Sequence, residues 1–85
     1  MSFIVEFRYL LEEMAKFCHK ELDNECIDAL KKNGLYLYNS EEYGELLGYL
    51  EELRNYGNVL EDNRERFLVL NRITECESFI RQEEL

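Results

Sequence analysis

The chain contains no proline, has few basic residues and has no long apolar run. Because proline is the strongest helix breaker, its absence leaves glycine and asparagine as the residues that mark helix ends. Ten bases stand against 19 acids, and the net charge of −9 argues against a conventional nucleic-acid-binding protein. The composition therefore favours a helical protein that makes no direct contact with nucleic acid.

The apolar runs are too short to cross a membrane. The longest have four residues, Leu35–Tyr38 and Phe67–Leu70, whereas a transmembrane helix needs about 20. The N-terminal segment is interrupted by Glu6 and has no basic leader, so we expect no signal peptide. Three cysteines, an odd number, predict free thiols and a cytoplasmic location in a bacterium or in the cytosol of an infected host.

The length predicts one domain over residues 1–85 with a single modest core. Hydrophobic residues make up 46% of the chain, too many for intrinsic disorder. A chain of this size has marginal stability, and proteins of this size often gain stability by self-association.

Apolar periodicity predicts the first two helices. Residues that recur every three or four positions predict one amphipathic helix over 3–22; they are Phe3, Phe7, Leu10, Leu11, Met14, Cys18 and Leu22. Asp23 and Asn24 then offer a cap for a short helix over 25–33. Its expected inward residues are Cys26, Ile27, Ala29 and Leu30. Gly34 would end this helix in the left-handed conformation.

Two further helices are predicted from capping boxes. Leu35–Tyr38 is expected to be extended or irregular, after which Asn39 and Glu42 would begin a third helix that ends at Gly57. Asn58 and Glu61 repeat the pattern and would begin a fourth helix that runs to about Glu83. Its expected inward residues are Val69, Leu70, Ile73, Cys76 and Ile80. The predicted fold is all-α, a small antiparallel helical bundle of three long helices plus one short helix.

The segment Tyr36–Tyr56 holds five of the six tyrosines, five glutamates and one base, Arg54. On a helical wheel its inward side is formed by Tyr43, Leu46, Leu47, Leu50 and Leu53. The other side predicts a partner-binding stripe, which consists of Glu41, Glu45, Tyr49, Glu52 and Tyr56. Tyrosine is enriched where proteins bind one another, and an acidic field selects a basic partner. The alternative is a solvated charged face.

Gly44 and Gly48 stand four apart in the same predicted helix. Each costs about 1 kcal/mol relative to alanine in a helix. The pair indicates close approach of another backbone, with tolerated glycines as the alternative.

The fourth predicted helix has more apolar surface than one core face requires. Its run Phe67–Leu70 covers every direction around the helix axis. We therefore predict self-association through Phe67, Leu68 and Phe79, to a homodimer or a higher oligomer. Val5 and Tyr9 form a second small apolar patch on the first helix.

No reaction can be assigned from the sequence. Cys18, His19, Cys26 and Cys76 match no zinc spacing, so we interpret the cysteines as three buried structural thiols and predict no metal and no cofactor. No glycine-rich phosphate loop and no nucleophile elbow is present. The protein is therefore predicted not to be an enzyme.

The leading hypothesis is a small acidic protein-binding module, an inhibitor, immunity or anti-defence protein that neutralises a basic protein surface, including the special case of a DNA mimic. In size, charge and helical build the chain is similar to the nuclease-colicin immunity proteins, but without proline it lacks their Tyr-Tyr-Pro motif. The likeness is one of design. The alternative is a homo-oligomeric helical assembly or adaptor that could sequester a small ligand between subunits, with Lys31, Lys32 or arginines holding an anion.

Overall fold

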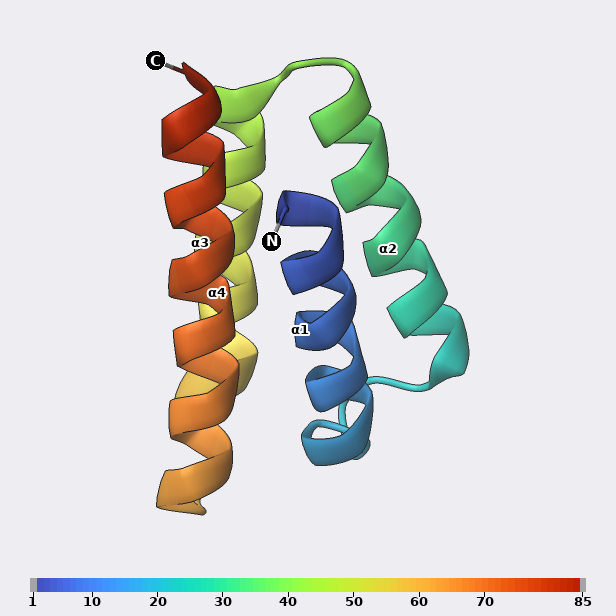
Figure 1. Ribbon diagram of the computed structural model, residues 1–85. Coiled ribbons are helices and arrows are strands. Elements are labelled where there is room, and N and C mark those ends of the chain that lie inside the picture. Colours follow the sequence, from blue (N-terminus) through green and yellow to red (C-terminus); the bar gives the residue numbers. More distant parts are fainter. Residues whose placement is uncertain (1, 85) are drawn as a thin grey trace.

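The computed structural model describes residues 2–84 and contains four helices (Figure 1). These are α1 (Phe3–Phe17), α2 (Asn24–Asn39), α3 (Tyr43–Asn58) and α4 (Asn63–Glu84). No strand occurs in the described part of the chain. The prediction of an all-helical fold with four helices is thus confirmed. The predicted short helix is wrong, because α2 has 16 residues against 15 for α1 and 16 for α3.

The four helices enclose one core within a globule of 36 × 25 × 21 Å. Helix α1 packs against α2 and α4, and α3 packs against the same two helices. Figure 1 shows α4 in front of α3 on one side and α1 beside α2 on the other. Each helix contributes to the buried apolar cluster, whose members are Phe3, Phe7, Leu10, Leu11, Met14, Cys18, Leu22, Leu37, Leu46, Leu50, Leu53, Val69, Ile73, Cys76 and Ile80.

Helix α1 is shorter than the apolar period predicted. It ends at Phe17 instead of Leu22, and Cys18 is its C-cap. The period continues because the following turn folds back onto the core: the Leu22 N–H donates to the Cys18 carbonyl, and the Leu22 side chain is 5% exposed. A turn with helix-like spacing therefore preserved the inward positions of Cys18 and Leu22 beyond the end of the helix.

Helix α2 begins as predicted but does not stop at Gly34. The Asp23 carboxylate accepts a hydrogen bond from the Cys26 N–H at 2.8 Å, which confirms the predicted cap. The structure contradicts the left-handed cap, because Gly34 has a negative φ and lies inside the helix. A Cβ on Gly34 would come within 2.3 Å of the Phe7 ring, so the glycine is needed for close packing of α2 on α1.

The segment expected to be extended forms the last turns of α2. Leu37 is buried there, and Tyr38 stacks on Phe3 with ring centroids 4.7 Å apart. The helix ends in a Schellman arrangement, in which the Glu42 N–H donates to the Leu37 carbonyl and the Glu41 N–H to the Tyr38 carbonyl. Glu41 takes the left-handed position, at φ 58°, where glycine is more usual.

Both predicted capping boxes are wrong. Asn39 is the last residue of α2, and α3 begins after Glu42 without a side-chain cap. The fourth helix starts at Asn63. Its cap is Asp62, four residues after the predicted Asn58, and the Asp62 carboxylate accepts a hydrogen bond from the Glu65 N–H at 2.9 Å. Helix α3 ends at Asn58, one residue beyond the predicted Gly57.

Gly44 and Gly48 do not mark a close approach. A Cβ at either position would meet no atom within 4 Å. The glycine of α3 that permits close packing is Gly57, whose Cβ would lie 2.9 Å from a methyl carbon of Leu70 on α4.

Candidate protein-binding face on helix α3

Four of the five predicted partner-binding residues lie on one flank of α3. Glu45 and Glu52 are exposed, while Tyr49 and Tyr56 are half-buried against the core cluster. The structure corrects the placement of Glu41, which lies in the connection between α2 and α3 and not on the helix. The flank therefore consists of Glu45, Tyr49, Glu52 and Tyr56, and we call these four residues the α3 stripe.

Tyr49 has an anchoring role that the sequence did not reveal. Its hydroxyl donates a hydrogen bond to the Leu30 carbonyl of α2 at 3.0 Å. Burial raises the pKa of the Tyr49 phenol above its usual value, which favours the neutral, hydrogen-bond-donating form. The ring consequently holds α3 against α2 and presents only part of its surface to solvent.

A shallow groove lies along the stripe, between α3 and α2. It is lined by Leu30, Tyr49, Glu52, Leu53, Asn55 and Tyr56. Aromatic and aliphatic carbon forms the groove, and Glu52 adds an acidic group. A concave apolar surface with an adjacent carboxylate suits an extended basic side chain, whose apolar stem and charged head need both.

The only base of α3 is held away from this stripe. The Arg54 Nε donates to Glu51 at 2.8 Å, and the Arg54 Nη2 donates to Glu77 on α4. Neither Glu45 nor Glu52 takes part in an ion pair within residues 2–84. The carboxylates of the stripe are therefore left without intramolecular neutralisation, while Arg54 serves the α3–α4 contact.

The predicted self-association residues are split between two sides of α4. Phe67 is 65% exposed and lies with Leu70 at a shallow depression on the outer side of the helix. Leu68 and Phe79 are half-buried, and Phe79 packs against the core. At 100° per residue, Leu68 and Phe79 lie within about 20° of each other and about 100° or more from Phe67. The three residues do not form one patch.

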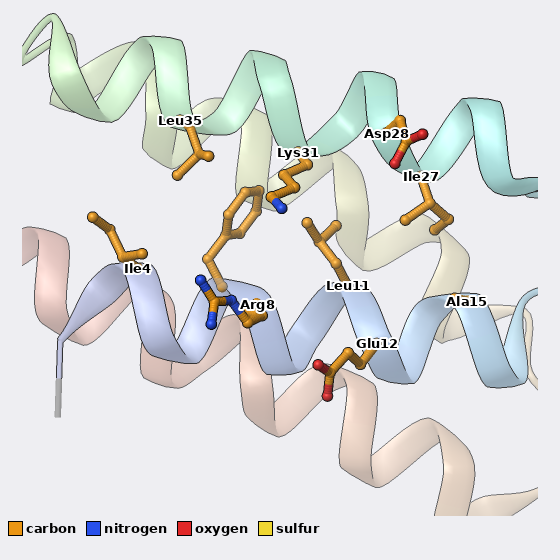
Figure 2. Close-up of a pocket in the computed structure, with 10 residues that line it drawn as sticks. Ile4, Arg8, Leu11, Glu12, Ala15, Ile27, Asp28, Lys31 and Leu35 are labelled. Carbon is orange, nitrogen blue, oxygen red and sulfur yellow. The ribbon is translucent and has the colours of Figure 1, made fainter.

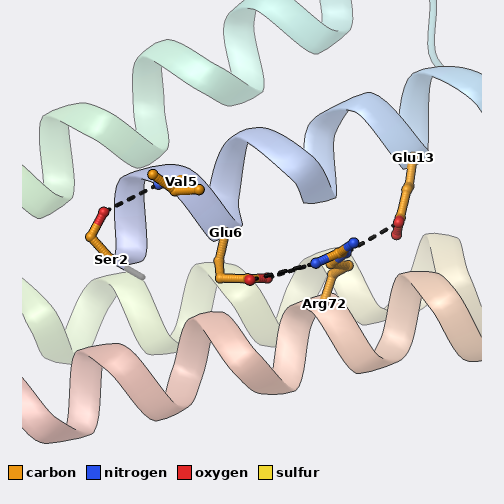
Figure 3. A network of polar contacts seen from close by, with 5 residues as sticks. All are labelled: Ser2, Val5, Glu6, Glu13 and Arg72. Atoms are coloured by element: carbon orange, nitrogen blue, oxygen red, sulfur yellow. Dashed lines mark hydrogen bonds and ion pairs between the residues drawn. The ribbon is translucent and has the colours of Figure 1, made fainter.

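In the second small patch, Val5 is exposed, whereas Tyr9 lies beside an ionic contact between α1 and α4. The Arg72 guanidinium lies 5.0 Å from the centre of the Tyr9 ring. It donates to Glu6 and to Glu13, each at 3.1 Å, as Figure 3 shows. The Glu6 side chain is buried, with 2% of the residue exposed. Sequence analysis missed this contact, although Glu6 does fall on the inward side of the first apolar period.

A second polar contact joins three helices. The Tyr38 and Tyr43 hydroxyls donate to the two oxygens of Glu83, at 2.7 and 3.0 Å. The hydrogen bond to Glu83 raises the pKa of Tyr38 to about 12. Tyr43, expected in the core, is half-buried beside this carboxylate.

The cysteines are not all buried, which corrects one expectation. Cys18 and Cys76 lie in the core, whereas Cys26 is exposed on α2. Burial raises the pKa of the Cys76 thiol to about 12 and also raises that of Cys18. Within residues 2–84 no three His, Cys, Asp or Glu side chains are placed to hold a metal ion. No described helix is long and apolar enough to cross a bilayer.

The hollow with the most apolar lining was not foreseen from the sequence. It lies between α1 and α2 and has a volume of about 310 Å³. The spacing of Ile4, Leu11 and Ala15 on the α2 side of α1 was its only signal in the sequence.

Comparisons with protein-family models, curated proteins and solved structures gave no match to this chain.

Proposed function

We propose that the chain is a small acidic protein-binding module that uses the α3 stripe to bind and neutralise a basic surface on another protein. One observation carries the proposal. Arg54 is engaged by Glu51 and Glu77, so the carboxylates of Glu45 and Glu52 are unpaired within residues 2–84 beside two tyrosines. Unpaired acids increase the rate of encounter with a basic partner, and aromatic side chains at an interface slow its dissociation.

The rest of the molecule supports this role as a scaffold. We take the fold to be an antiparallel bundle, because helices that pack side by side are joined by short connections. Tyr49 is fixed by its hydrogen bond to Leu30, so the binding surface is preorganised and loses little side-chain entropy on binding. Three cysteines without a disulfide fit a reducing cytoplasm. An inhibitor, immunity or anti-defence role, including mimicry of DNA, requires no catalytic group.

The proposal can be tested by affinity capture from a lysate of the native cell, at low and at high salt. The test variant is Glu45→Lys/Glu52→Lys, because both side chains are exposed and make no ion pair in the described residues. The matched control is Glu75→Lys/Glu84→Lys, which makes the same charge change on exposed positions of α4. We expect a basic protein that the wild type and the control retain at low salt and that the test variant loses.

A second candidate function is a homo-oligomeric assembly or adaptor, and the exposure of Phe67 favours it. Phe67 is 65% exposed and adjoins the half-buried Leu70 at one surface depression, so the two side chains offer an apolar contact. Because Leu68 and Phe79 face another direction, the contact would centre on Phe67 and the nearby Leu70. A dimer that Phe67→Glu converts to a monomer would support this candidate.

A further inference from the structure

The hollow between α1 and α2 has the size and shape of a small-molecule site. Its volume of about 310 Å³ lies within the range of ligand pockets, about 300–1,000 Å³. Apolar side chains of both helices line it, among them Ile4, Leu11, Ile27 and Leu35 (Figure 2). Sites between the helices of a bundle are a common place for such pockets.

The floor of the pocket depends on Gly34. The Phe7 ring lines the pocket and lies so close to α2 that a Cβ on residue 34 would be 2.3 Å from its Cζ. Phe7 is buried, so its ring is held in place. The glycine thus lets an aromatic ring close the base of the hollow, while the side facing solvent stays open.

Two cations stand across the pocket from each other. Arg8 projects from α1 and Lys31 from α2, both in the half of the pocket nearer Ile4 and Leu35 (Figure 2). Neither side chain takes part in an ion pair within residues 2–84. Arg8 and Lys31 are the two bases among the residues that line the pocket, and a bound anion would neutralise their charges.

The opposite half of the pocket carries acids. Asp28 lies beside Ile27, and Glu12 lies on α1 between Arg8 and Ala15 (Figure 2). A ligand with a carboxylate at each end would place one of them beside these acids and be repelled. The pocket therefore has a direction, with a place for an anionic head at Arg8 and Lys31 and an apolar path along Leu11 towards Ile27.

We propose that the α1–α2 pocket binds an amphiphile with one carboxylate and an unbranched apolar tail, the chemistry of a fatty acid. The carboxylate accepts hydrogen bonds from the Arg8 guanidinium and the Lys31 ammonium, and the tail lies over Phe7 and Leu11. The pocket shares no lining residue with the groove along the α3 stripe, so this proposal is independent of the protein-binding function.

The test uses decanoate, below the concentration at which it forms micelles, added to the ¹⁵N-labelled full chain and followed by NMR. The control ligand is decylammonium, which has the same tail and the opposite charge. We expect saturable shifts at amides of α1 and α2 with decanoate and at least about tenfold weaker binding of decylammonium. General attraction to an acidic protein would give the reverse order. Equal or tighter binding of decylammonium at the same amides would overturn the proposal.

Substitutions inside and outside the α1–α2 pocket test whether decanoate binds there. Arg8→Gln/Lys31→Gln removes the two cations of the pocket. It should lower the affinity for decanoate at least about tenfold, because charge-assisted hydrogen bonds are lost. Lys16→Gln/Lys32→Gln makes the same charge change at exposed positions outside the pocket and should leave the dissociation constant unchanged. Ala15→Leu should weaken binding by filling the apolar end. If both double variants bind decanoate equally, or if decanoate produces no saturable shifts, the assignment is wrong.

Discussion

Individual glycines differ in what they contribute to this fold. Gly44 and Gly48 have open space where a Cβ would be, whereas Gly34 lies against the Phe7 ring. A helical glycine without a packing reason only weakens the helix. The sequence cannot show which glycines are needed for close packing, because all four lie in or beside predicted helices. Whether a Cβ would fit depends on the neighbouring helix.

We expect Gly44→Ala and Gly48→Ala each to raise the free energy of unfolding by about 1 kcal/mol. Gly34→Ala should lower it, since the new Cβ would have to displace a buried ring. Urea denaturation of the three variants measures these changes. The account of the glycines would fail if Gly34→Ala were as stabilising as the other two substitutions.

The raised pKa of Tyr38 leads us to expect a lower free energy of unfolding at high pH. The pKa of Tyr38 is raised from 10.0 to about 12, chiefly by its hydrogen bond to Glu83 and then by burial. A raised pKa means that folding favours the neutral phenol, so this stabilisation is complete below pH 10 and is lost as the pH rises towards 12. Phenolate absorbance is followed against pH in the wild type and in Tyr38→Phe. The difference between the two curves reports Tyr38 and should have its midpoint near pH 12. A midpoint near 10 would contradict the hydrogen bond.

At the scale of the helices, the inward faces of α1 and α4 could be predicted from the sequence, whereas helix ends could not. The predicted inward face of α2 was wrong, because Cys26 and Ala29 are exposed. The apolar period identified the buried positions of α1 and α4, because burial repeats with the helical turn. Capping residues were less informative, since Asn39 and Asn58 lie at the ends of α2 and α3 and cap nothing. Asp62 forms the cap of α4 instead.

The α3 stripe was predicted in outline for the same reason. Its residues follow helical spacing, so their common flank could be read from the sequence. The bond from Tyr49 to Leu30 and the capture of Arg54 by Glu77 both depend on a neighbouring helix. Glu41 was misplaced because the left-handed end of α2 could not be foreseen in a residue other than glycine.

The ionic part of the contact between α1 and α4 depends on one arginine. Arg72 is the only base that pairs with the buried Glu6 within the described residues. We expect Arg72→Met to lower the free energy of unfolding by about 2 kcal/mol or more, because it leaves a buried carboxylate unpaired. Urea denaturation at pH 7 measures the change.

The matched control is Arg64→Met, at an exposed position of α4 that makes no ion pair in residues 2–84. It should change the stability by less than about 0.5 kcal/mol. The double variant Glu6→Gln/Arg72→Met should recover much of the loss, since the unpaired charge is gone. Equal effects of Arg72→Met and Arg64→Met would show that the pair contributes nothing.

At the scale of the whole molecule, the two candidate functions predict different assembly. A binding module that uses the α3 stripe works as a monomer, whereas an assembly through Phe67 requires a stable dimer or larger ring. The sequence predicted self-association through Phe67, Leu68 and Phe79, but these residues do not form one patch in the structure. We therefore expect light scattering to give a monomer at hundreds of micromolar. A dimer that persists on dilution and is lost in Phe67→Glu, but not in Gln82→Glu, would favour the second candidate. Gln82 is an exposed position of α4 outside the depression beside Phe67, so the control makes an acidic substitution away from the proposed contact.

The charge distribution explains why the binding surface is assigned to α3. Arg8, Lys16, Lys20, Lys31 and Lys32 all lie within or between α1 and α2. Helix α3 has one base, which is engaged with two acids. The negative field is therefore least opposed beside the stripe, and a basic partner should approach there first.

The central claim is tested most directly by the association rate of the captured basic protein, measured by stopped flow at several salt concentrations. We predict that Glu45→Lys/Glu52→Lys slows association by at least about tenfold at low salt and flattens its salt dependence, because electrostatic steering is lost. Glu75→Lys/Glu84→Lys, with the same net charge, should slow it much less. If the two variants associate at the same rate, only net charge matters and the α3 stripe is not the binding surface.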